Sequence, residues 1–244
     1  MWESFKQLST EQNEINKIFE GKSYIDTKTK ERQVSALERY VMKERAENQE
    51  LHKLLLACYH SSLTKSDIYN KTFEKFIPRE NNQKIYDKLK NWTPDSKIGL
   101  MLYGPVGTGK THLLKAVALK WACSHYQVSF KTISSLCDVL RTDFKQAQMV
   151  IEDCLLPDLL ILDDFGILDP SEWMKDKILT IIEKRLNKNK TIMISANLKL
   201  EEFGAKFGDR LLDRLKEMLA FVEIKGMSHR DEISRSNQAI WEDL

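Results

Sequence analysis

Cysteine pairs, long apolar runs and a leader-like N-terminus are missing from this chain of 244 residues, and each absence excludes a class of protein. The four cysteines, Cys58, Cys123, Cys137 and Cys154, lie far apart, which argues against a zinc site and fits reduced thiols. No apolar run approaches the ~20 residues that span a bilayer, and the first residues lack the charged-then-apolar order of a signal peptide. We therefore expect a cytoplasmic protein without a membrane partner.

A large excess of charge of either sign is also absent, because the net charge is +2 at pH 7. The total charge therefore does not mark a nucleic-acid-binding protein, although it leaves room for a local basic patch. Hydrophobic residues make up 42% of the chain and charged residues 30%, so a sizeable core is possible. The length allows one large domain or a core domain with a smaller module.

Glycine and proline are scarce in the first part of the chain, where Gly21 is the only glycine before Gly99 and Pro78 is the first proline. From Lys28 to His60 the sequence is rich in strong helix formers, with apolar residues at helical spacing. We predict an all-α N-terminal domain here. It is either a solvated helical layer packed on its own chain or a docking module for a protein partner.

Beyond Gly99, apolar strands alternate with helical patterns, which indicates βαβ units around a parallel sheet. We expect strands at 100–103, 128–133, 159–164, 191–196 and 220–224, and helices at 82–92, 111–124, 136–144, 173–186 and 203–218. The predicted domains are a helical domain over 1–70, a connector over 71–98 and an α/β core over 99–244.

The most informative stretch is a glycine-rich one, Gly104-Pro105-Val106-Gly107-Thr108-Gly109-Lys110-Thr111. It fits G-x-x-x-x-G-K-[ST], the phosphate-binding loop, and it has the required strand before it and helix after it. The backbone N–H groups of such a loop and the N-terminus of the helix both favour phosphate. We expect Lys110 to reach the β- and γ-phosphates, Thr111 to ligate Mg²⁺ and His112 to border the nucleotide. The cofactors predicted are ATP and Mg²⁺.

Polar residues follow two of the predicted strands. Asp163 and Asp164 end one buried strand and Asn197 follows another, at the sheet edge where α/β proteins bind ligands. Asp163 fits a Mg²⁺-organising acid and Asp164 a residue that orients or activates the attacking water. Asn197 is placed to bind the γ-phosphate or the water, although an asparagine there is also an ordinary turn residue.

Arg210 and Arg214 stand four residues apart and so share one face of a predicted helix. They either pair with Asp209 and Asp213, or one of them reaches the γ-phosphate of a neighbouring subunit as an arginine finger.

The motifs G-P-V-G-T-G-K-T, L-L-I-L-D-D-F-G, T-I-M-I-S-A-N-L and G-D-R-L-L-D-R-L, in this order, resemble the AAA+ ATPases of the DnaC/DnaI/IstB group. These are bacterial and phage replicative-helicase loaders and transposition helper ATPases, and the similarity covers about residues 72–230. The resemblance implies a three-layer AAA+ core without a C-terminal lid domain. It makes Asp163 and Asp164 the Walker B acids, Asn197 sensor 1, and Arg210 or Arg214 the finger. Many AAA+ proteins have Asp-Glu in place of Asp163-Asp164, so we expect slow, switch-like hydrolysis.

The resemblance also implies partners. It suggests a helicase loader that holds a hexameric, DnaB-like replicative helicase through its N-terminal domain, self-associates into a ring or spiral, and engages single-stranded DNA. Lys131, Arg141 and Lys145 lie where such DNA contacts fall, although they also fit a solvated helix face. One alternative is an IstB-like transposition helper that binds duplex DNA and recruits a transposase. Another is a nucleotide-gated adaptor with negligible turnover.

Overall fold

The computed structural model describes residues 61–79, 82–93, 98–142 and 144–226, with the single positions 228, 229, 231, 234, 238 and 241. The helical domain predicted over 1–70 therefore lies outside the described residues up to residue 60, and its structure and role stay predictions. The helices are α5 (Lys65–Asn70), α6 (Gln83–Asn91), α7 (Lys110–Cys123), α8 (Ile133–Leu140), α9 (Phe144–Leu155), α10 (Glu172–Asn187), α11 (Leu200–Phe207) and α12 (Asp209–Met218). The strands are β1 (Gly99–Tyr103), β2 (Val128–Thr132), β3 (Leu159–Phe165), β4 (Thr191–Ala196) and β5 (Leu219–Glu223).

The five strands form one parallel sheet in the order β2-β3-β4-β1-β5. The inner strands β3 and β4 are almost wholly buried, which explains why their sequences are near-continuous apolar runs. Since the strands are parallel, all five end at the same edge of the sheet. The loop after β1, the acids of β3 and the residues after β4 therefore meet there, and the predicted α/β class is confirmed.

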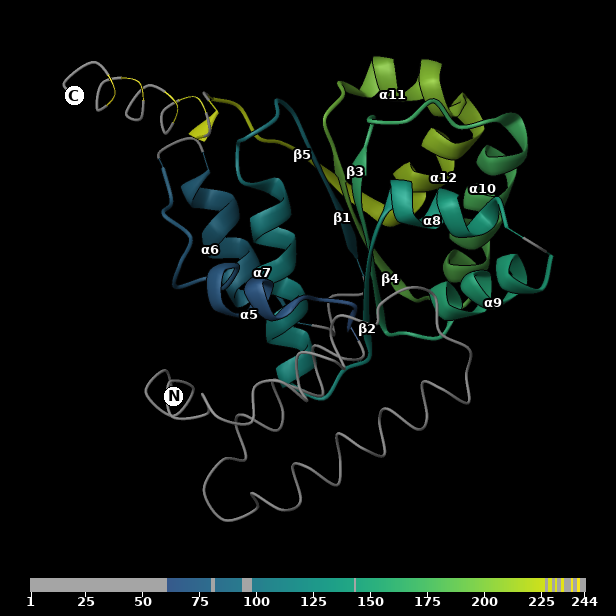
Figure 1. The fold of residues 1–244 in the computed structure, drawn as a ribbon, viewed down its shortest axis with the longest axis horizontal. Helices are drawn as coiled ribbons and strands as arrows, with labels where there is room; N and C mark the ends of the chain where they lie inside the picture. Colours follow the sequence, from purple (N-terminus) through teal and green to yellow (C-terminus); the bar gives the residue numbers. More distant parts are fainter. Residues whose placement is uncertain are drawn as a thin grey trace, which may run out of the picture.

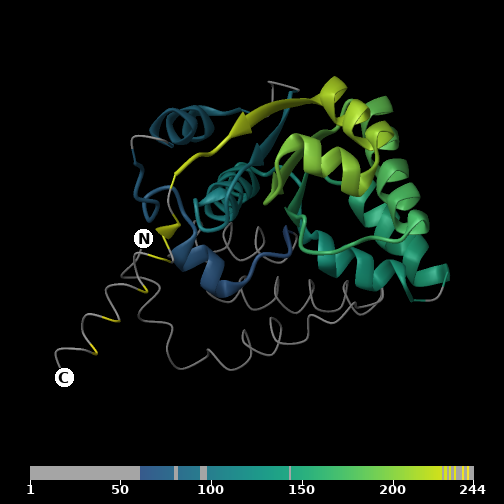
Figure 2. The ribbon, with the colours of Figure 1, turned by 90° about the horizontal axis from the view of Figure 1, so that it is seen from above.

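Helices cover both faces of the sheet and give three layers (Figure 1). The helices α5, α6 and α7 share one hydrophobic core with residues such as Leu100 and Ile161. The helices α8 to α12 share a second core with residues such as Leu160 and Ile194 on the other face. The view from above places α5 and α6 on the same side of the sheet as α7 (Figure 2).

Two expectations for the helices were wrong. The helix predicted at 136–144 is α8, which ends at Leu140, and the helix that follows it, α9, was missed although Ala147, Val150, Ile151 and Cys154 have helical spacing and are buried. The helix predicted at 203–218 is two helices, because the chain turns at Gly208 with φ +94, a conformation that favours glycine.

The connector packs closely on the helix that follows the phosphate loop. The side chains of Phe73 and Phe76 are buried in the core beside α7. The Lys115 ammonium of α7 lies 2.6 Å from the carboxylate of Asp67, which caps α5 together with Thr64. Burial raises the pKa of Asp67, but the hydrogen bonds and charge supplied by Lys115 and Thr64 outweigh it, so that the pKa is lowered. Both α5 and the connector are therefore packed directly on α7.

Candidate nucleotide-binding site

The phosphate loop connects β1 to α7 at the carboxyl edge of the sheet. Lys110 is 4% exposed, and its ammonium donates to the carbonyl oxygens of Gly104 (2.8 Å) and Pro105 (2.7 Å). The hydroxyl of Thr108 donates to the Pro105 carbonyl at 2.9 Å, which closes the loop on itself. The loop thus holds the lysine at its centre, at the first turn of α7, where the helix dipole is positive.

The segment after β5 lies against this loop. The backbone N–H of His229 donates to the Gly107 carbonyl at 3.0 Å. Gly107 has φ +80, and a Cβ added there would come within 2.0 Å of the Ser228 hydroxyl, so only glycine fits. The guanidinium of Arg79 lies 3.0 Å from the His229 Nδ1. Connector and C-terminal segment therefore border the loop together.

The two carboxylates stand where strand β3 bulges. Leu162 pairs with Ile194 and Phe165 with Ala196, so β3 has one residue more than β4 across this interval. Asp163 is 1% exposed, and its Oδ1 accepts a hydrogen bond from the Thr111 hydroxyl at 3.2 Å. Asp164 has φ +62, and its Oδ1 accepts a hydrogen bond from the Asn197 amide at 3.3 Å. The structure thus brings Lys110, Thr111, the two acids and Asn197 to one edge.

Burial raises the pKa of Asp163, and the neighbouring charge of Asp164 raises it further, while the hydrogen bonds from Ser195 and Thr111 oppose the shift. A buried carboxylate of this kind is stabilised by a cation. The Thr111 hydroxyl and the Asp163 carboxylate are oxygen donors in contact with each other, which is the donor set that Mg²⁺ uses together with phosphate oxygens. These two residues therefore fit the predicted magnesium site.

His112 faces the connector. Its Nε2 donates to the Thr72 carbonyl at 2.8 Å, and its ring meets Phe76 edge-on at 5.1 Å between centroids. Burial lowers the pKa of His112, which favours the neutral ring. Its contacts thus link α7 to the connector, and a role beside the nucleotide stays a prediction.

Arg210 and Arg214 lie on α12, on the opposite side of the sheet from α7 (Figure 1). They pair with Glu183 of α10, at 3.0 and 3.6 Å, and Arg214 also pairs with Glu217 at 2.7 Å. The alternative in which they pair with Asp209 and Asp213 was wrong, because Glu183 of the neighbouring helix α10 and Glu217 are within reach and Asp213 pairs with Lys216 at 3.2 Å. The side chain of Arg210 is 72% exposed and that of Arg214 41%.

The three basic residues predicted for DNA lie around β2, α8 and α9. Lys131 lies on edge strand β2, Arg141 ends α8 and pairs with Asp138 at 3.2 Å, and Lys145 is exposed in the first turn of α9. Between the last two stands Phe144, whose side chain is 83% exposed. The sequence analysis did not single out this residue, and its exposure beside two basic residues is seen only in the structure.

A scan against protein families matches residues 14–237 to the IstB-like ATP binding proteins. The chain belongs to this family. It is therefore an ATP-binding protein of the AAA+ type, and the resemblance to the DnaC/DnaI/IstB group is confirmed. The family supports ATPase activity in general. In this IstB-like chain the phosphate loop and the two acids lie together at the carboxyl edge of the sheet.

Relatives of both kinds expected from the sequence are found. An insertion sequence IS5376 protein of Geobacillus stearothermophilus, named for ATP binding, is 26% identical over 173 residues, which are 66% of this chain and 68% of that protein. The replicative helicase loader DnaC of Escherichia coli is 23% identical over 155 residues, 60% of this chain and 63% of that protein. This IstB-like chain thus spans less than two thirds of the loader's length.

The fold agrees with a solved structure of the group. A crystal structure of the DnaC helicase loader superposes with a TM-score of 0.56 at 23% identity, covering 66% of this chain and 100% of that one. Within the part of the chain that the structure describes, no helix is long and apolar enough to cross a membrane.

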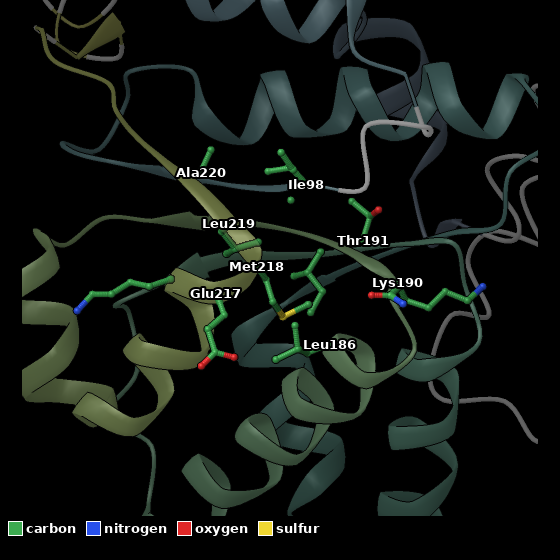
Figure 3. Close-up of a pocket in the computed structure, with 12 residues that line it drawn as sticks. Ile98, Leu186, Lys190, Thr191, Glu217, Met218, Leu219 and Ala220 are labelled. Carbon is green, nitrogen blue, oxygen red and sulfur yellow. The ribbon is translucent and has the colours of Figure 1, made fainter.

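A cavity of about 370 Å³ lies at the other end of the sheet (Figure 3). It is lined by the first residues of β1, β4 and β5, namely Gly99, Thr191 and Leu219, and by Leu186 and Met218 from the ends of α10 and α12. The cavity lies at the amino ends of the strands, and ligands of open α/β sheets bind at the carboxyl ends. It is therefore separate from the candidate nucleotide site.

Proposed function

We propose that this IstB-like ATPase loads a ring-shaped replicative helicase, with ATP and Mg²⁺ switching its assembly and its grip on single-stranded DNA. The observation that carries the ATPase part is the meeting of Lys110, Thr111, Asp163, Asp164 and Asn197 at one sheet edge. The loader part rests on the similarity to the replicative helicase loader DnaC.

Each residue of the site has a role that its position supports. The Lys110 ammonium exchanges the loop carbonyls for phosphate oxygens when ATP binds, because a charged acceptor is the stronger partner. Thr111 and Asp163 would hold Mg²⁺, which would supply positive charge to neutralise the phosphates. Asp164 and Asn197, joined by a hydrogen bond, orient the attacking water.

The finger is Arg210 in this proposal. Its exposed ion pair with Glu183 is worth about 0–1 kcal/mol, so a γ-phosphate of a neighbouring subunit can replace it. Arg214 is less exposed and has two carboxylate partners, Glu183 and Glu217, which hold it on its own chain. A site completed by a neighbour requires head-to-tail assembly, and such contacts generate a ring or a spiral.

Single-stranded DNA binds at the corner between α8 and α9. Phe144 offers a ring on which a base stacks, and Arg141 and Lys145 flank it with charges for the backbone. Binding of this type tolerates any sequence and weakens with salt.

The helicase is held by residues 1–70 in this proposal. The Asp67–Lys115 ion pair supports it, because it ties α5, the described end of that region, to the helix that begins at the phosphate loop. The hydrogen bond from His112 to Thr72 ties the connector that follows to the same helix. The alternative function is a transposition helper that binds duplex DNA, and the similarity to the IS5376 protein favours it.

The test uses the full chain with ATP and Mg²⁺ as bait in a lysate of the source organism, with Lys110→Ala as the matched control. Removing the lysine's charge-assisted hydrogen bonds, each worth about 1.5–3 kcal/mol, should weaken ATP binding at least tenfold and abolish the capture of the partner. Recovery of the replicative helicase by the wild-type chain alone supports the loader. Recovery of a transposase, with binding to duplex rather than single-stranded DNA, would replace it by the alternative.

A further inference from the structure

A buried serine lies between the two acids of the site. Ser195 is on β4, two residues before Asn197, and its side chain is fully buried. Its hydroxyl accepts a hydrogen bond from the backbone N–H of Asp164 at 2.9 Å and donates one to Oδ1 of Asp163. A hydroxyl has one proton, and a carboxylate only accepts, so these donor and acceptor roles are determined by the two partners.

The bulge in β3 explains why the serine is needed there. The regular ladder between β3 and β4 is interrupted between Leu162 and Phe165, so the amide of Asp164 has left the strand-to-strand pattern. A buried amide without a partner is costly, and the Ser195 hydroxyl takes the place of the ladder. The backbone of Asp164 is at the same time in the left-handed region, with φ +62, which residues other than glycine rarely adopt.

We propose that Ser195 is a positioning residue that sets the two acids for their separate tasks. Resting on the ATPase function proposed above, it holds Asp163 beside Thr111 for Mg²⁺ and holds the backbone of Asp164 so that its carboxylate faces Asn197. Both Ser195 and Thr111 donate to the same oxygen of Asp163, which orients the carboxylate from two sides. The end of β4 thus supplies two hydrogen bonds to Asp164. The Ser195 hydroxyl accepts from its backbone amide, and the Asn197 side-chain amide donates to its carboxylate.

A role confined to stability makes a different prediction from this one. Loss of a buried hydrogen bond alone lowers the free energy of unfolding and leaves the response of the folded protein to Mg²⁺ unchanged. Misplacement of Asp163 lowers the part of the nucleotide affinity that depends on Mg²⁺, because that residue meets the nucleotide only through the metal.

The experiment measures binding of a fluorescent ATP analogue to the full chain with Mg²⁺ and with a chelator, for wild type, Ser195→Ala and Ser195→Thr. We expect Ser195→Ala to bind the metal-free analogue with the affinity of wild type. The factor by which Mg²⁺ raises that affinity should be at least about tenfold smaller in the variant than in wild type. Ser195→Thr keeps the hydroxyl and should restore most of that gain. Ser129→Ala, which removes a buried hydroxyl from β2, is the matched control and should respond to Mg²⁺ like wild type.

The outcomes separate this inference from the function on which it rests. A wild-type chain that binds no ATP overturns the proposed function itself. A wild-type chain that binds ATP, together with a Ser195→Ala variant that has an unchanged Mg²⁺ response, overturns only the role of Ser195. If Ser195→Ala does not fold, a folded Ser195→Thr variant without the Mg²⁺ gain also overturns it, because the hydroxyl is then present without the effect.

Discussion

At the scale of single residues, the site depends on one strained position. Asp164 is an aspartate with φ +62, a conformation that costs about 1–3 kcal/mol and persists only where the surroundings hold it. The surroundings here are the Ser195 hydroxyl on its amide and the Asn197 amide on its carboxylate. Strain of this kind gathers at functional sites, so the backbone geometry supports the role proposed for the second acid.

Asp164→Asn removes the charge and little else, because asparagine also tolerates the left-handed region and keeps an oxygen for Asn197. We expect ATP affinity to stay within about twofold and hydrolysis to fall about 100-fold or more, the usual range for loss of an acid–base group. Single-turnover hydrolysis and analogue binding on the same preparation measure both. Helicase loading that continues unchanged in this variant would favour the nucleotide-gated adaptor over the ATPase switch.

At the scale of elements, one arginine ties together the ends of several. Arg185 of α10 is fully buried and donates to the carbonyl oxygens of Cys154, Pro157, Asp158 and Thr191, at 2.6 to 3.2 Å. These carbonyls belong to the end of α9, the entry into β3 and the start of β4. Burial lowers the pKa of Arg185 to about 10. The guanidinium therefore stays charged at neutral pH and joins the neighbouring strands β3 and β4, which lead to Asp163 and Asn197.

Arg185→Met should lower the free energy of unfolding by about 3 kcal/mol or more, because several buried carbonyls lose a charged donor at once. The exposed neighbour Lys184→Met is the control and should change it by less than about 0.5 kcal/mol. Urea unfolding followed by circular dichroism measures both. Equal midpoints for the two variants would mean that water or other donors replace the guanidinium, and that the arginine does not join the strands.

At the scale of the whole molecule, α7, which begins at the phosphate loop, and α12, which carries the candidate finger, lie on opposite sides of the sheet (Figure 1). One copy of the chain therefore does not bring Arg210 to its own Lys110, and the proposed ATPase needs two copies in contact. The exposed ion pair of Arg210 contributes little to stability. Replacing Arg210 should therefore affect contacts between subunits without unfolding the chain.

Mixing two inactive variants tests this arrangement. Lys110→Ala lacks a working loop and Arg210→Ala lacks the finger, so each should show little hydrolysis alone. An equal mixture should regain activity, since roughly one interface in four then pairs an intact loop with an intact finger. Arg214→Ala in place of Arg210→Ala is the comparison and should keep activity without mixing. Full activity of Arg210→Ala alone would exclude Arg210 as the finger.

Local patterns were enough to predict the order of the strands along the chain, the phosphate loop and the two acids. The runs before Gly104, Asp163 and Asn197 are apolar because β1, β3 and β4 are buried, and strands buried on both faces are recognisable without any tertiary information. The motif around Lys110 is equally local, because a loop that surrounds phosphate needs its glycines in sequence. The break at Gly208 was missed because buried apolar residues keep helical spacing on both sides of it, from Phe203 to Leu215, although glycine is itself a weak helix former. Helix α9 was missed although its buried residues also have helical spacing.

Only the tertiary structure decided which side chains meet across strands. Ser195 has no neighbour in sequence that marks it, and its importance arises from a bulge in a different strand. Glu183, the partner of Arg210, is 27 residues away in the sequence. Three of the four carbonyls around Arg185 are 27 to 31 residues away from it. Hydrogen bonds and ion pairs of this kind depend on distance in space, and sequence periodicity describes only which face of an element is buried.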